Sequence, residues 1–163
     1  MRQSGGHTHI LLNDGRRVQI HGERYSYFGW FLVILVTAGI IRKDDKILIA
    51  QRKKKTLRSY ALQGKWEFPG GKLEENESPE EGLRRELQEE LNIDVKVGKF
   101  FTESIHSYPN LKVDILAYTV EYVKGSLKLT SHSQVKWVKI SELSEYEFVE
   151  ADRPIVKKLL ETG

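Results

Sequence analysis

The stretch from Gly70 to Ile93 constrains this chain more than any other, because it joins a glycine pair to a strongly amphipathic helix. Ser78 is a good N-cap, Glu81 three residues later completes a capping box, and the proline between them suits the first helical position. Leucines recur every four residues, which predicts one face packed against a core, and acidic residues occupy the opposite face. The leucines are Leu83, Leu87 and Leu91, and the acidic residues are Glu86, Glu89 and Glu90.

Three carboxylates at spacings of three and four residues lie side by side on a helix and repel one another. A bound divalent cation removes this repulsion, and Mg²⁺ typically binds through a few carboxylates together with substrate phosphates. The glycine pair Gly70-Gly71 lets the backbone approach the same site closely. Arg85 precedes the acidic cluster and is placed to pair with Glu77, which would hold the loop against the helix.

The spacing of these residues resembles the signature of the Nudix hydrolases. Asn92 stands where the family has glycine, and asparagine is the next most tolerant residue at a left-handed helix end. The competing interpretation is a solvated acidic helix without a metal. The residues that match the signature are Gly71, Glu77, Arg85, Glu86, Leu87, Glu89, Glu90 and Ile93.

The resemblance implies an α/β (α+β) protein with the Nudix fold, a mixed β-sheet sandwiched between helices. Independently, apolar runs and alternation predict strands, and Asp152-Arg153-Pro154 predicts the start of a final helix that continues through Leu160. We expect Ile155, Leu159 and Leu160 to face inward. The predicted strands cover residues 31–41, 47–51, 94–101, 112–123, 126–129 and 135–138.

Residues 1–27 lie outside the resemblance and are interpreted as an N-terminal extension, with residues 28–163 as the Nudix hydrolase domain. Asn13-Asp14-Gly15 between two short apolar segments predicts an extra N-terminal β-hairpin. Three interpretations of this extension stay open: it packs at the edge of the sheet, it mediates a dimer contact, or it is partly disordered.

The similarity to the MutT-like branch of the family implies the substrate-binding residues. Arg52 at the end of a strand approaches the nucleotide, although a solvated basic loop is the alternative. Phe68 either stacks on the base or belongs to the core. Asp152 either reads the base or caps the last helix. Gly71 and His132 complete the expected binding residues. Related enzymes often carry a candidate base glutamate immediately before this histidine, and its role cannot be carried over to Ser131.

The implied reaction is Mg²⁺-dependent cleavage of nucleoside triphosphates to monophosphate and pyrophosphate, as in MutT-like clean-up of the nucleotide pool. Either 8-oxo-dGTP or CTP and 5-methyl-dCTP would be the substrates, and a non-catalytic nucleotide- or RNA-binding Nudix module is the alternative. Mn²⁺ is an expected substitute for Mg²⁺. The expected metal-binding residues are Gly70, Glu86, Glu89 and Glu90. The expected catalytic residues are Glu86, Glu89 and Arg85, with Glu89 preferred as the general base, and Glu77 is structural.

Composition limits the remaining possibilities. The chain has 163 residues, enough for one domain, and no cysteine, which excludes disulfides and zinc–thiolate sites. Its net charge of +3 fits an anionic ligand without indicating nucleic acid. The apolar run at residues 28–41 is too short to span a bilayer. We therefore expect a cytoplasmic monomer or homodimer with a nucleotide substrate and no membrane or nucleic-acid partner.

Overall fold

The computed structural model describes residues 8–11, 17–20, 25–28, 31–53, 62–109 and 111–163. Its centre is a mixed sheet of eight strands, in which β4 runs parallel to β9 and the other neighbours are antiparallel. The main strand order is β10-β5-β4-β9-β8, and of the three short strands β3 and β7 pair with β4 and β6 pairs with β5. The strands are β3 (Tyr25–Phe28), β4 (Phe31–Lys43), β5 (Lys46–Arg52), β6 (Trp66–Glu67), β7 (Gly70–Lys72), β8 (Ile93–Tyr108), β9 (Leu111–Gly125) and β10 (His132–Lys139).

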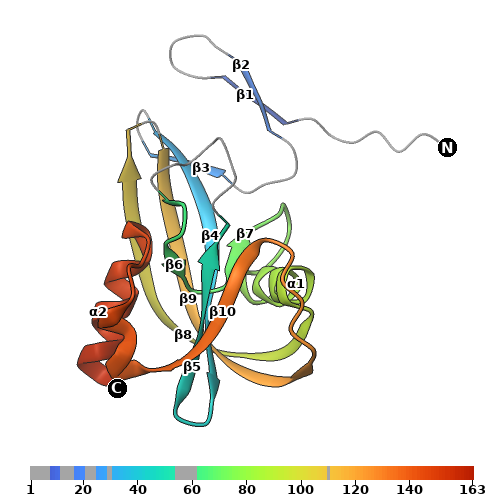
Figure 1. The fold of residues 1–163 in the computed structure, drawn as a ribbon. Coiled ribbons are helices and arrows are strands. Elements are labelled where there is room, and N and C mark those ends of the chain that lie inside the picture. The colour runs from blue at the N-terminus through green and yellow to red at the C-terminus, as the bar shows by residue number, and fades with distance from the viewer. Residues whose placement is uncertain (1–7, 12–16, 21–24, 29–30, 54–61, 110) are drawn as a thin grey trace, which may run out of the picture.

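Helices α1 (Pro79–Leu91) and α2 (Arg153–Thr162) cover opposite faces of this sheet (Figure 1). The leucine stripe of α1 packs with Ile41, Leu48 and Tyr118 in one core cluster. The apolar face of α2 packs in a second cluster with Ile49 and Phe68. Two short 3₁₀ helices, η2 (Ile140–Glu145) and η3 (Glu150–Asp152), lead into α2. The predicted sheet between helices is therefore confirmed.

The predicted ends of α1 are also confirmed. The Ser78 hydroxyl accepts the backbone N–H of Glu81 at 3.2 Å, and the Glu81 carboxylate accepts the backbone N–H of Ser78 at 2.9 Å. This exchange satisfies two of the backbone donors that every helix start leaves unpaired. At the other end Asn92 adopts a left-handed conformation with φ of 55°, which allows the chain to turn directly into β8.

An N-terminal hairpin is present as a separate two-stranded sheet. β1 (Thr8–Leu11) pairs antiparallel with β2 (Arg17–Ile20), and Thr8 lies opposite Ile20. The residues of the predicted turn, Asn13 to Gly15, lie outside the described part of the chain. β3 follows the hairpin and pairs with β4 in the main sheet.

Two local predictions are wrong. Residues 126–129 do not form a strand; instead the N–H of Lys128 donates to the carbonyl of Leu91, at the open end of α1. Those helix-end carbonyls need partners, and this segment supplies them. Leu160 is 43% exposed, because the buried stripe of α2 is Ile155, Val156 and Leu159, and Leu160 lies one residue beyond it. The strands β8 and β9 are also longer than predicted.

Within the described residues, every helix is too short or too polar to cross a membrane.

Candidate active site

Arg85 is the centre of the ion-pair network on α1. Its guanidinium binds Glu77 with two hydrogen bonds, Nε to Oε1 at 2.8 Å and Nη2 to Oε2 at 3.0 Å. Its Nη1 also donates to Glu86 Oε1 at 2.9 Å and to Glu89 Oε2 at 3.4 Å. The hydrogen bond with Glu77, and then that with Glu86, outweighs the effect of burial and raises the pKa of Arg85, so the side chain is permanently charged. The loop before α1 is thus tied to the face that carries the carboxylates.

The three predicted metal-binding glutamates differ in burial. Glu89 is exposed, with 61% of its side chain accessible, whereas Glu86 and Glu90 are largely covered. Burial raises the pKa of both covered carboxyls, opposed at Glu86 by the Arg85 hydrogen bond. Gly71 lies against Glu86, and a Cβ at Gly71 would come within 2.3 Å of the Glu86 carboxyl carbon. A side chain at Gly71 would therefore displace the Glu86 carboxylate where β7 approaches α1.

A second series of contacts leads from Glu90 to the end of β5. Glu90 Oε2 lies 4.0 Å from Nδ1 of His132, and Nε2 of the same ring lies 2.9 Å from Glu67 Oε1. Glu67 Oε2 in turn lies 3.0 Å from Nη1 of Arg52. His132 is only 4% exposed, so the imidazole is enclosed between the two carboxylates. The structure thus brings the predicted residues Arg52 and His132 together with Glu67, which the sequence did not single out.

Asp152 and Phe68 form a third part of the site. Asp152 is 4% exposed, and its Oδ2 accepts the backbone N–H of Phe68 at 2.7 Å. Burial, reinforced by the charge of Glu67, raises the pKa of Asp152 to about 8. Its carboxyl makes no side-chain hydrogen bond that would cap α2. The ring of Phe68 is buried and packs on Phe148 at 5.2 Å between centroids.

Comparison with known proteins identifies the family. The NUDIX domain matches residues 33–159. A CTP pyrophosphohydrolase of Escherichia coli K12 is 34% identical over 128 residues, which are 78% of this chain and 92% of that protein. The chain belongs to the Nudix hydrolase family. This confirms the resemblance carried by the residues of α1 and the loop before it.

Two further relatives place this Nudix hydrolase in the MutT-like branch. An 8-oxo-dGTP diphosphatase of Proteus vulgaris is 42% identical over 93 residues, 56% of this chain and 80% of that protein. The solution structure of the E. coli ORF135 protein superposes with a TM-score of 0.71 and 32% identity, covering 83% of this chain and 94% of that one. The chain is therefore an enzyme that hydrolyses phosphoanhydride bonds. These relatives favour the enzyme over the non-catalytic module.

Nudix hydrolases generally use divalent metal ions, and the donors of this Nudix domain suit one. Carboxylate and carbonyl oxygens surround the junction of β7 and α1, and Glu90 Oε2 is buried without a hydrogen-bond partner among the described residues. Within the same residues, no three acidic or histidine side chains lie together as a group that could hold a metal ion in their present rotamers. Arg85 holds Glu86 and Glu89 in this arrangement, and Glu89 is exposed enough to change rotamer.

Sequence patterns missed Glu67 and Tyr108. Tyr108 ends β8, and burial followed by the charges of Glu150 and Asp152 raises its pKa. Its ring contacts His106 edge to face, with 4.6 Å between centroids. Ser104, on the same strand, donates to the carbonyl of Ala151 and so joins β8 to η3 beside Asp152. The strand predicted at residues 94–101 ended before Ser104 and Tyr108, so the sequence pattern did not place these two residues near the site.

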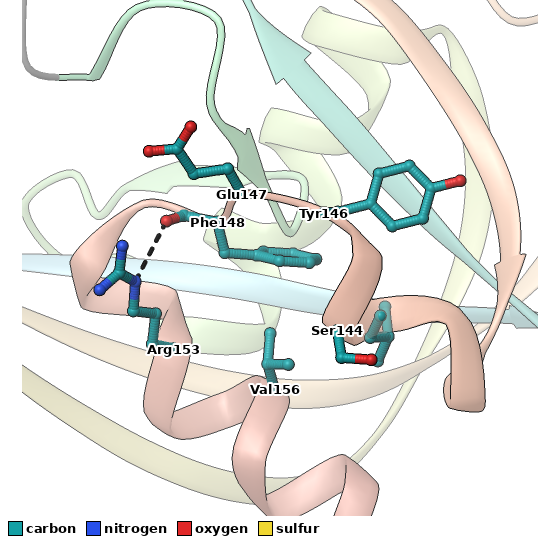
Figure 2. Close-up of a pocket in the computed structure, with 7 residues that line it drawn as sticks. Ser144, Tyr146, Glu147, Phe148, Arg153 and Val156 are labelled. Carbon is teal, nitrogen blue, oxygen red and sulfur yellow. Dashed lines mark hydrogen bonds between the residues drawn. The ribbon is translucent and has the colours of Figure 1, made fainter.

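A cavity of about 240 Å³ lies between η2 and α2 (Figure 2). Phe148 and Val156 point into it, and Arg153 at its margin donates to the carbonyl of Phe148 at 3.4 Å. Its lining includes no residue of α1 and no predicted site residue. The cavity is therefore separate from the carboxylates of the Nudix helix.

Proposed function

We propose that this Nudix hydrolase cleaves nucleoside triphosphates to monophosphate and pyrophosphate with Mg²⁺, with Mn²⁺ as a substitute. The observation that carries the proposal is the clustering of Glu86, Glu89 and Glu90 on one face of α1, two of them linked to Arg85. The relatives named as a CTP pyrophosphohydrolase and an 8-oxo-dGTP diphosphatase support the substrate class. Glu86, Glu89 and Glu90, with the carbonyl of Gly70, would hold the metal.

The chemistry divides between the charge of the substrate and the activation of water. A bound Mg²⁺ would neutralise phosphate charge and lower the pKa of the attacking water. Glu89 is the preferred general base, because it is the exposed member of the cluster. Glu86 is the second choice. Arg85 orients both carboxylates through Nη1 and balances their charge.

Recognition of the nucleotide is assigned to residues outside α1, at the end of β5 and the start of α2. In this proposal Arg52, which pairs with Glu67, contacts phosphate or base, and Asp152 reads the base edge through the oxygen that does not accept the Phe68 N–H. With a pKa of about 8, the carboxyl of Asp152 is mostly protonated at neutral pH and can donate as well as accept. This property is compatible with an oxidised guanine or a cytosine. Phe68 supports the site through its backbone, since its ring is buried.

The test is pyrophosphate release from a panel of normal and damaged nucleoside triphosphates with Mg²⁺. Glu89→Gln should reduce kcat by roughly a hundredfold or more, because the variant cannot accept the proton. Glu161→Gln, an exposed carboxylate on α2, is the matched control and should retain parental turnover. Near-normal turnover in Glu89→Gln, or full activity in EDTA, would refute the assignment.

A further inference from the structure

Three consecutive residues, 130 to 132, converge on Glu90. We call them the Glu90 clamp. The backbone N–H of Thr130 donates to the carbonyl of Glu90 at 3.2 Å, and its hydroxyl donates to the same carbonyl at 3.3 Å. Ser131 favours the ionised Glu90 carboxyl, opposing the effect of burial on its pKa. Nδ1 of His132 lies 4.0 Å from Glu90 Oε2, so the clamp binds the backbone of this residue and lies against its carboxylate.

The polar atoms between His132 and Glu90 are left unsatisfied. Nδ1 of His132 and Oε2 of Glu90 are both buried, and neither has a hydrogen-bond partner in the described part of the chain, although they lie 4.0 Å apart. Buried polar atoms without partners are costly and are seldom retained without a role. The other ring nitrogen is firmly engaged with Glu67 at 2.9 Å. One buried imidazole therefore stands between a carboxylate of α1 and a carboxylate of β6.

The position of the imidazole is fixed by the sheet. His132 lies opposite Arg52 in the β10–β5 pairing, and a register shift follows between His132 and Gln134. Within that bulge Ser133 Oγ donates to the carbonyl of Gln51 at 3.2 Å. Gln134 also donates to the side chain of Gln51 at 2.6 Å. The bulge aims the ring into the interior, and these bonds hold it there.

We propose that His132 is a positioning residue that couples Glu67, on the nucleotide side of the site, to Glu90, on the metal side. The inference rests on the proposed function, because that function gives Glu90 its role toward the metal. Outer-shell groups behind a ligating carboxylate set its orientation, and the loss of such a group typically costs about 10- to 100-fold in metal affinity. Through His132, a change at Glu67 reaches Glu90 and alters metal binding without touching the metal.

A double-mutant cycle on metal binding tests this coupling in the full chain without nucleotide. The probe is Mn²⁺, and its Kd is measured by calorimetry and by the spin-resonance signal of the free ion. The four proteins are the parent, Glu67→Gln, His132→Asn and the double variant. Asn is too short to bridge the two carboxylates. Should His132→Asn not fold, His132→Phe keeps the ring volume without the nitrogens and takes its place, with thermal unfolding as the check.

We expect His132→Asn to weaken Mn²⁺ binding by about tenfold or more. Glu67→Gln should weaken it by about threefold or more in the parent and by less than about twofold in the His132→Asn background. Glu150→Gln removes a carboxylate that pairs with Lys65 and does not contact His132. It controls for the charge itself and should leave the Kd unchanged.

The outcomes separate this inference from the proposed function. Equal effects of Glu67→Gln in the two backgrounds, with Mn²⁺ binding intact, would overturn the coupling through His132 alone. Parental Mn²⁺ affinity in His132→Asn would overturn it as well. Absence of Mn²⁺ binding by the parent protein would overturn the proposed metal site and this inference together.

Discussion

Asp152 Oδ2 lies 2.7 Å from the backbone nitrogen of Phe68, 84 residues earlier in the chain. This hydrogen bond joins the start of α2 to the loop that leads into the Nudix signature. Asp152 is thus held at the site by the backbone of Phe68 and does not cap the helix that follows it. Because one carboxyl oxygen is engaged, the other oxygen and its protonation state determine what Asp152 can offer a base.

The first prediction concerns the choice of substrate by Asp152. A protonated carboxyl and an amide both offer a donor and an acceptor, whereas an ionised carboxylate only accepts. Because the pKa of Asp152 is about 8, Asp152→Asn should change substrate ranking little well below that pH and clearly above it. Above that pH, the ratio of kcat/KM for 8-oxo-dGTP to kcat/KM for CTP should be roughly tenfold higher in the variant than in the parent. This factor corresponds to one hydrogen bond of about 1.4 kcal/mol.

The measurement is kcat/KM for CTP, dCTP, 5-methyl-dCTP and 8-oxo-dGTP at about pH 6.5 and about pH 9.5, on either side of the Asp152 transition. Glu161→Gln, an exposed carboxylate near the end of α2, serves as a control for nonspecific effects of substitution. An unchanged ranking at both pH values would mean that Asp152 does not read the base.

A second prediction follows from the burial of Asp152. Its pKa rises from 3.8 in the unfolded chain to about 8 in the fold. Between these values the folded protein binds a proton that the unfolded chain has released, so stability falls as pH rises, by up to about 1.4 kcal/mol per pH unit. Asp152→Asn lacks this loss. The free energy of unfolding of the variant relative to the parent should therefore increase steadily with pH. The increase should begin near pH 4 and end near pH 8, each limit being good to about half a pH unit.

Urea unfolding of both proteins across this range provides the measurement, and the difference between them cancels the titration of groups they share. Glu150→Gln is a useful contrast, because the hydrogen bond from Lys65 lowers the pKa of Glu150 and the sign of its contribution is opposite. A flat difference between Asp152→Asn and the parent would show that Asp152 is ionised in the fold.

The third prediction separates a structural glutamate from a catalytic one. Glu77 accepts two hydrogen bonds from Arg85 and one from the backbone N–H of Glu74. Glu77→Gln leaves part of the guanidinium unpaired and should reduce the free energy of unfolding by about 1–3 kcal/mol. Its loss of kcat should be smaller than that of Glu89→Gln, whereas its loss of stability should be larger. Thermal unfolding and turnover measurements on Glu77→Gln and Glu89→Gln test this ordering. A larger loss of kcat in Glu77→Gln and a larger loss of stability in Glu89→Gln would show that Glu77 is the catalytic residue and Glu89 the structural one.

Local spacing predicted the parts of the site that lie close together in the chain. The capping box spans Ser78 to Glu81, within the first turn of the helix. Glu77 and Arg85 are only eight residues apart, and their places in the signature indicated that the loop folds back to pair them. The contact of His132 with Glu67 spans 65 residues and exists only because β10 pairs with β5. No periodicity in the sequence encodes that juxtaposition. Glu67 was therefore missed, although its neighbours in the chain were recognised.

The same distinction explains the two local errors. Residues 126–129 have strand-like composition, but the backbone N–H of Lys128 donates to the carbonyl of Leu91 at the end of α1. A local sequence pattern does not predict which segment will bind the unpaired carbonyls of a helix end. Leu160 continues an apolar run whose buried stripe ends at Leu159. In both cases a tertiary contact decided between local options.

The last prediction contrasts two adjacent glycines. A Cβ at Gly71 would meet the carboxyl group of Glu86 at 2.3 Å, whereas a Cβ at Gly70 would lie 2.0 Å from the backbone oxygen of Thr37. A side-chain end can move aside and a paired strand cannot. Gly71→Ala should therefore keep the fold and displace Glu86, which weakens Mn²⁺ binding by roughly tenfold. Gly70→Ala should instead lower stability by more than about 2 kcal/mol, because β7 must separate from β4.

Thermal unfolding and Mn²⁺ calorimetry on both variants test the contrast. Gly39→Ala is the control, since its Cβ would meet only side chains at 3.3 Å or more. Loss of the fold in Gly71→Ala, or parental Mn²⁺ affinity in a folded Gly71→Ala, would show that the approach of Gly71 to Glu86 has another purpose than shaping the metal site.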